Sequence, residues 1–124
     1  MEASLTEKFV FICSPYRPET LDEEKRQVEL AENVRFAKSA CCVALREGYV
    51  PMAPHLYFTQ FLDDSDTDQR EAGLEMGLAW LESCMEVWVF GDRITSGMAR
   101  EIAFANEMGI PVKIKHIEEE EETA

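Results

Sequence analysis

Three segments of the chain carry side chains whose types and spacing could support chemistry. The first follows the apolar run 8–13 and offers Ser14, Tyr16 and Arg17 between two prolines. A hydroxyl and a guanidinium at the end of a buried strand are suited to hold a phosphate or a carboxylate. The same residues could equally form a rigid exit turn in which Arg17 pairs with a surface acid. The spacing leaves both interpretations open.

A second segment, GDRITSGMARE, ends at Glu101. Its Thr95, Ser96 and Gly97 would lie at the N-terminus of a helix, where free backbone amides attract anions. Glu101 would then lie in the first helical turn, where an acid favours the helix dipole. In a pocket with a positioned leaving group, the same carboxylate could act as a nucleophile. Asp92 could cap this helix, donate a proton or accept a hydrogen bond from a sugar hydroxyl.

The third segment, predicted as a loop over residues 55–68, holds His55 and a group of aspartates. A lone histidine is more often structural, but this one is expected on the same side of the sheet as the other two segments. The aspartates are Asp63, Asp64, Asp66 and Asp68. They lack the glycine and terminal glutamate of a calcium loop, which favours a solvated acidic loop over a metal site. No dinucleotide-binding glycine motif, P-loop or hydrolase triad is present, and no cofactor is predicted.

Apolar periodicity predicts four strands with helices between them. The strands are expected at 8–13, 49–52, 86–91 and 111–116, and the helices at about 22–47, 69–84 and 97–108. Gly48 and Gly109 are expected to end the first and the last helix. Helical crossovers require a parallel sheet covered on both faces. The three segments above would meet at the carboxyl ends of the strands, where such sheets bind small molecules.

Length and composition indicate a single globular domain. The chain has 124 residues and no apolar run of about 18 that could span a membrane. The net charge is −13, and so acidic a surface repels a nucleic-acid polymer. The polar N-terminus does not suit a secretory signal, so a cytoplasmic protein is expected. Five acids form the run Glu118 to Glu122, and residues 118–124 are expected to be a disordered tail.

The four cysteines are expected to be reduced. Cys13, Cys41, Cys42 and Cys84 form no CxxC pair, and zinc would require two spaced pairs or histidine partners. We therefore predict that they serve as small apolar residues of the core.

Three longer stretches together resemble a known family. They read VFICSPYRP, GYVPMAPHLYFTQFLDD and CMEVWVFGDRITSGMAREIAFANEMGIPV. The combination is similar to the nucleoside 2-deoxyribosyltransferase-like superfamily, and within it to a branch of small bacterial and phage proteins. The resemblance covers residues 8 to 115. It implies a flavodoxin/Rossmann-like three-layer sandwich over residues 1–117, with four to five mostly parallel strands, and a homo-oligomer.

The resemblance also implies roles for particular residues. In the characterised transferases and the related deoxynucleotide N-glycosidases, a glutamate in a Gly-x-x-x-Glu stretch attacks the anomeric carbon of the sugar. Gly97 and Glu101 have this spacing, and Asp92 matches an acid–base or sugar-contacting aspartate. In glycosidases that prefer phosphorylated substrates, the first loop and a hydroxyl before the glycine bind the 5′-phosphate. The predicted ligand-binding residues are therefore Ser14, Tyr16, Arg17, His55, Thr95, Ser96, Gly97 and Met98.

We therefore expect an N-glycosidase or deoxyribosyltransferase that acts on a nucleoside or nucleoside 5′-monophosphate, with Glu101 as nucleophile. Its carboxylate would stabilise an oxocarbenium-like state, and Asp92 or His55 could protonate the leaving base. The second predicted helix has GLAW at 77–80 where the transferases carry an aspartate. This difference keeps open a non-catalytic nucleotide-binding module. A third alternative is an interaction protein that docks a partner through its acidic tail and an aromatic patch of Tyr57, Phe58 and Phe61.

Overall fold

Four parallel strands form one sheet in the computed structural model, which describes residues 8–117. In sheet order they are β2 (Val50–Met52), β1 (Phe9–Cys13), β3 (Glu86–Val89) and β4 (Val112–Ile114). All three neighbouring pairs run parallel, with Phe11 opposite Val87 and Val87 opposite Val112. The predicted acidic tail at 118–124 lies outside the described residues.

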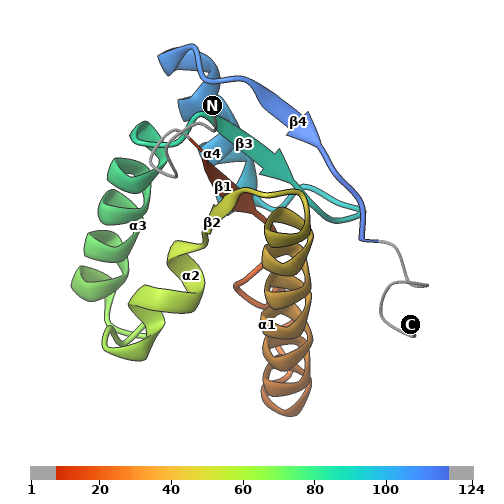
Figure 1. The fold of residues 1–124 in the computed structure, drawn as a ribbon. Helices are drawn as coiled ribbons and strands as arrows, with labels where there is room; N and C mark the ends of the chain where they lie inside the picture. The colour runs from red at the N-terminus through yellow and green to blue at the C-terminus, as the bar shows by residue number, and fades with distance from the viewer. Residues whose placement is uncertain (1–7, 118–124) are drawn as a thin grey trace, which may run out of the picture.

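Three long helices connect the strands. They are α1 (Glu23–Arg46), α3 (Thr67–Glu82) and α4 (Ser96–Met108). Helix α1 packs on one face of the sheet, and α3 and α4 pack on the other (Figure 1). The predicted α/β fold with helices on both faces is therefore confirmed. None of the helices between residues 8 and 117 is long and apolar enough to cross a membrane.

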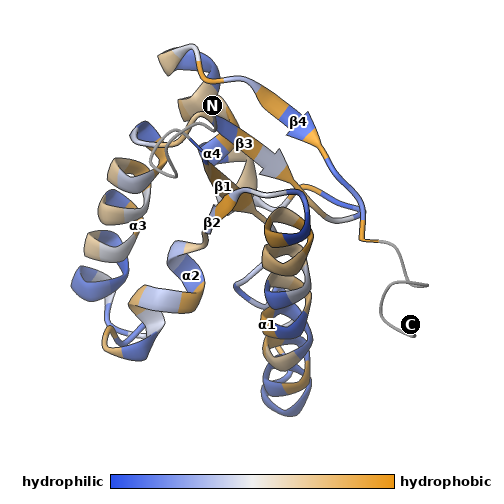
Figure 2. Ribbon diagram, in the orientation of Figure 1, coloured by the Kyte–Doolittle hydropathy of each residue, from blue (hydrophilic) through white to orange (hydrophobic). Residues whose placement is uncertain are grey.

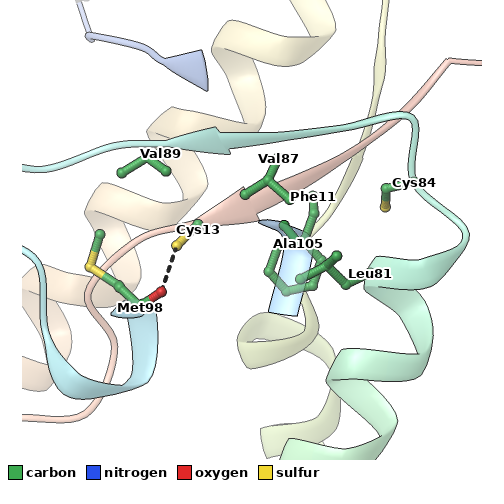
Figure 3. Packing of buried hydrophobic residues seen from close by; sticks show 8 residues of the cluster. All are labelled: Phe11, Cys13, Leu81, Cys84, Val87, Val89, Met98 and Ala105. Carbon is green, nitrogen blue, oxygen red and sulfur yellow. Dashed lines mark hydrogen bonds between the residues drawn. The ribbon is translucent and has the colours of Figure 1, made fainter. Parts of the chain in front are cut away.

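The strands supply two apolar clusters, one on each face, because successive side chains alternate across a sheet. Toward α3 and α4, buried residues of β1 and β3 meet Leu81 and Ala105 (Figure 3). Toward α1, Trp88 packs with Ala40 and Ala44. The helices carry hydrophilic residues beside hydrophobic ones, as elements with one buried face do (Figure 2). The central strands are buried on both faces, which explains their continuous apolar sequences.

The helix ends follow from local sequence. The N-cap side chains of the long helices are Asp22, Asp66 and Thr95, and each accepts a hydrogen bond from a backbone N–H of the first turn. Thr95 therefore takes the capping position that the sequence left open for Asp92. Gly48 and Gly109 follow α1 and α4 with φ values of 86° and 75°, which confirms both predicted ends.

The segment predicted as a loop over residues 55–68 contains two short helices, and that prediction is wrong for its first half. They are α2 (Pro54–Tyr57) and the 3-10 helix η2 (Phe58–Gln60). Pro54 occupies the first turn of α2, where its fixed φ suits a helix. Each helix is too short to leave a periodic pattern in the sequence. The segment is anchored to α3, because the rings of Tyr57 and Phe58 pack 5.4 and 4.8 Å from that of Trp80.

Only part of the cysteine prediction is confirmed. All four cysteines are free, and Cys13 and Cys84 are buried. Cys41 is half-buried and Cys42 is exposed. The core assignment is wrong for Cys42, because adjacent residues of a helix point in different directions and only Cys41 turns toward the sheet.

Candidate ligand-binding cleft at the carboxyl ends of the strands

The chain changes its direction across the sheet between β1 and β3. Strand β1 leads to β2 on one side, and β3 leads to β4 on the other. In open parallel sheets such a switch point opens a crevice outside the carboxyl ends of the strands. A cleft of about 420 Å³ lies there, bounded by the loop after β1, the α2–η2 segment and the first turns of α3 and α4. Sites for small molecules have volumes of roughly 300–1,000 Å³.

All eight predicted ligand-binding residues line this cleft. They are Ser14, Tyr16, Arg17, His55, Thr95, Ser96, Gly97 and Met98. They follow three different strands, and parallel pairing brings those strand ends to one edge of the sheet. Their part in binding a ligand stays a prediction.

Glu101 lies behind this lining, on the second turn of α4 and not on the first turn as predicted, because the helix begins at Ser96. It is buried, with 7% of its surface exposed, and its Oε2 atom lies 3.4 Å from His55 Nε2. Its Oε1 atom has no hydrogen-bond partner within residues 8–117. A buried carboxylate oxygen without a partner is costly, because it loses its hydration without compensation. The carboxylate is therefore one side chain away from the cleft and is only partly satisfied by its surroundings.

His55 separates Glu101 from the cleft. Its ring stacks on that of Tyr16, with centroids 5.0 Å apart and planes 11° from parallel. Its backbone carbonyl accepts a hydrogen bond of 2.6 Å from the Thr59 hydroxyl. Pro54 fixes the backbone immediately before it. The ring is thus held by the first loop on one face, while one nitrogen points to the buried carboxylate.

The Cys13 thiol is the other titratable group close to Glu101. Burial raises its pKa, and the negative charge of Glu101 raises it further. The thiol therefore stays protonated, and its sulfur lies 3.8 Å from the Met98 carbonyl oxygen (Figure 3). Among the described residues, no lysine or arginine pairs with Glu101.

Three arginines line the cleft of a protein whose net charge is −13: Arg17, Arg70 and Arg100. Arg17 Nε lies 3.9 Å from Asp64 Oδ2 with both side chains about half exposed, which is a weak ion pair. The guanidinium groups of Arg70 and Arg100 have no hydrogen-bond or ion-pair partner in the part of the chain that the structure describes. The cleft is therefore locally basic and holds unused donors that suit an anionic group.

Asp64 also lines the cleft, although its side chain is 45% exposed, so it is both solvated and part of the cleft wall. Partial burial raises the pKa of its carboxyl; the charge of His55 opposes this shift and that of Asp63 adds to it. The pKa of Asp63 itself is lowered by hydrogen bonds from Ser65. The solvated interpretation holds for the exposed neighbours Asp63, Asp66 and Asp68.

Asp92 is exposed and does not line the cleft. It follows Gly91, whose φ of 123° is open to glycine and strained for other residues. A Cβ at Gly91 would lie 3.2 Å from Pro15 Cδ, so the chain turns here in close contact with the first loop. The turn leaves the Asp92 side chain outside the cleft. Its acid–base role stays a prediction that this position does not favour.

Sequence reasoning missed the wall that α3 contributes. Arg70, Gly73 and Leu74 line the cleft and share one helix face at i, i+3 and i+4. The helix begins at Thr67, two residues before its predicted start, so this face belongs to its first two turns. The spacing is visible in the sequence. However, this spacing indicates a ligand site only when the α2–η2 segment is known to lie across the cleft from α3.

The fold is that of an open α/β protein with a cleft of small-molecule size at its topological switch point. The chain belongs to the family described as a domain of unknown function (DUF7768), whose model matches residues 8–115. No curated protein matches it.

A solved structure of a 2-deoxyribosyltransferase from the psychrotolerant bacterium Bacillus psychrosaccharolyticus has a similar fold. The two chains are 19% identical with a TM-score of 0.56, and the match covers 87% of this chain and 72% of that chain. The transferase is described as a biocatalyst for the synthesis of antiviral and antitumoral nucleosides. At this identity the likeness shows the fold alone, and it supports a structural relationship to that class of protein. Kinship with a bacterial and phage branch stays a prediction.

Proposed function

We propose that this protein breaks the N-glycosidic bond of a nucleoside or nucleoside 5′-monophosphate, with Glu101 as nucleophile. The observation that supports it is the buried carboxylate, unpartnered at Oε1 and 3.4 Å from a histidine that lines the cleft. Such a carboxylate is stabilised when positive charge develops beside it. An oxocarbenium-like state at the anomeric carbon supplies that charge.

The reaction proceeds in two displacements. A Glu101 oxygen bonds to the anomeric carbon while the carbon–nitrogen bond breaks and its electron pair leaves with the base. Attack requires the two atoms to approach within about 3–3.5 Å, so the His55 ring must swing away from Glu101 as the sugar enters. Water then resolves the glycosyl ester in a hydrolase, and a second base resolves it in a transferase.

The arginines favour a phosphorylated substrate. Arg70 and Arg100 line the cleft without partners among the described residues, and Arg17 is only weakly paired. Guanidinium groups bind phosphate through charge-assisted and often bidentate hydrogen bonds. A 5′-monophosphate accepts hydrogen bonds from these donors, whereas a free nucleoside has no phosphate to accept them.

The function is tested with a panel of ribo- and deoxyribonucleosides, their 5′-monophosphates and a free acceptor base. Mass spectrometry follows released base and new nucleoside. We expect release by the wild-type protein and a loss of at least about 10³-fold in Glu101→Gln, as for removal of other nucleophiles. Glu107→Gln, an exposed change on the same helix, should keep wild-type activity. Equal rates in Glu101→Gln and the wild type would reject the nucleophile.

A non-catalytic nucleotide-binding module is the second candidate, because His55 stands between Glu101 and the cleft. It predicts that a panel nucleotide raises the melting temperature without being consumed. Binding would then survive in Glu101→Gln with an unchanged dissociation constant.

A further inference from the structure

The proposed reaction needs a second titratable group besides the nucleophile. A nucleobase leaves slowly as an anion, and a positioned acid typically accelerates such a departure by about 10²–10⁴-fold. The carboxyl and imidazole groups that line the cleft, within the described residues, belong to Glu19, His55 and Asp64.

Two of these groups are already engaged. Glu19 Oε1 lies 3.1 Å from Arg93 Nη2, and its side chain is 54% exposed. His55 Nε2 lies 3.4 Å from Glu101 Oε2, so the imidazole is already paired with the proposed nucleophile. Asp92, which the sequence suggested as an acid, is exposed outside the cleft lining.

Asp64 differs from both. It enters the cleft from the segment between η2 and α3, across from the loop after β1, where Arg17 reaches it at 3.9 Å. That contact is long, and no shorter ion pair holds the carboxyl within residues 8–117. Asp64 is also near enough to His55 for their charges to interact. The cleft therefore has one carboxyl behind His55 and another on its open side.

We propose that Asp64 is the acid–base residue of this cleft. The assignment rests on the proposed function. As Glu101 bonds to the anomeric carbon, the carbon–nitrogen electron pair moves to the base and the Asp64 carboxyl gives its proton to a base nitrogen. In the second step the Asp64 carboxylate takes a proton from the attacking water or acceptor base, and the Glu101 carboxylate is released.

The electrostatic surroundings of Asp64 support its role as the acid. Partial burial raises the pKa of Asp64; the charges of His55 and Arg26 oppose that shift, and Asp63 adds to it. A raised pKa keeps the acid form present to higher pH, so the rate should fall as pH rises through it. Pairs of titratable groups with different surroundings commonly divide the acid and nucleophile roles in this way.

The test compares Asp64→Asn with Asp68→Asn on two leaving groups. Asp68 is a nearby exposed carboxylate that neither lines the cleft nor shifts the pKa of Asp64, so its variant is a matched control. The first substrate is a purine deoxynucleoside 5′-monophosphate. The second is its 7-methylguanine counterpart, whose base already carries a positive charge and leaves without a proton.

We expect Asp64→Asn to lower kcat for the first substrate by about 10²-fold or more and to change the second by less than about threefold. Its rate with the first substrate should also lose the decline toward high pH. Asp68→Asn should match the wild type on both substrates. Thermal unfolding of each variant separates misfolding from loss of the acid.

Each other outcome rejects the assignment. Wild-type rates of Asp64→Asn on the unactivated substrate, or equal losses on both substrates in a folded protein, would show that Asp64 gives no proton to the base. If the wild-type protein releases base from no member of the nucleoside and nucleotide panel, the proposed function fails and this assignment fails with it.

Discussion

Two buried glutamates lie at opposite ends of the sheet in very different surroundings. Glu86 begins β3, where its Oε1 accepts a hydrogen bond of 2.8 Å from Trp88 Nε1 and its Oε2 lies 2.7 Å from Lys113 Nζ. Burial alone would raise the pKa of Glu86, but these two hydrogen bonds and the charges of Lys113 and Lys115 together hold its pKa below the ordinary value. Glu101, beyond the carboxyl end of β3, has an unpartnered oxygen and a histidine at 3.4 Å.

The cationic side chains near the two glutamates also differ in whether they have partners. Near Glu86, Lys113 is paired, and Lys115 lies 2.9 Å from Glu47 and 4.0 Å over the Trp88 ring. In the cleft, Arg70 and Arg100 lack partners within residues 8–117. A network whose members satisfy one another contributes to stability, whereas groups left unsatisfied at one place are available to a ligand. The comparison indicates a structural role for Glu86 and supports the functional role proposed for Glu101.

The largest effect on stability is expected at Glu86. Glu86→Ala leaves the buried Trp88 Nε1 without an acceptor and should lower the free energy of unfolding by about 1–3 kcal/mol in urea titrations. Glu82→Ala, an exposed change, should stay within about 0.5 kcal/mol. Since the folded pKa of Glu86 is lowered, its contribution is present above pH 4.5 and is lost as pH falls through that pKa. Equal stability of the two variants would show that Glu86 does not stabilise the fold.

The next effect concerns the cations. The double change Arg70→Gln and Arg100→Gln should raise KM for a 5′-monophosphate about tenfold, the effect of about 1.4 kcal/mol, and leave KM for the nucleoside unchanged. Stability should not fall, because neither side chain has a partner in the described structure. Lys113→Gln is the converse control: it should leave KM unchanged and destabilise the fold. A matching rise in KM for the nucleoside would contradict a phosphate role.

The smallest effect is expected in the stability of Glu101→Gln. The change removes a buried charge whose Oε1 atom has no partner within residues 8–117, so the free energy of unfolding should stay constant or rise by up to about 1 kcal/mol. Thermal and urea unfolding measure it beside the activity loss. A fall of the size expected for Glu86→Ala would show that Glu101 is a structural residue.

The fold could be predicted because its signals are local and repeated. The continuous apolar runs of β1 and β3, the long periodic α1 and the glycines after α1 and α4 each have a single physical interpretation. Helices between strands then leave only a parallel sheet. The α2–η2 segment escaped prediction because one-turn helices carry no period, and its position depends on Trp80, more than 20 residues away.

The site was predictable where residues directly follow strands. Ser14, His55 and Thr95 lie in the cleft because each belongs to the loop or turn after a parallel strand, and these strand ends meet at one edge of the sheet. Asp92 follows a strand as well, but the turn at Gly91, which lies close to Pro15, leaves it outside. Asp64 and Arg70 come from a loop and a helix start whose packing is tertiary. The sequence alone therefore does not distinguish these two residues from charged residues elsewhere on the surface.

The two tryptophans lie in different parts of the molecule. Trp88 is 1% exposed beneath Lys115, whereas Trp80 packs 4.8 Å from Phe58, a residue of the cleft wall. Indole emission depends on local polarity and mobility, so Trp80 should respond to an occupant of the cleft while Trp88 reports unfolding. In Trp88→Phe the remaining tryptophan emission comes from Trp80 and should report ligand binding. Candidate nucleosides and nucleotides can then be ranked by affinity before any turnover is sought.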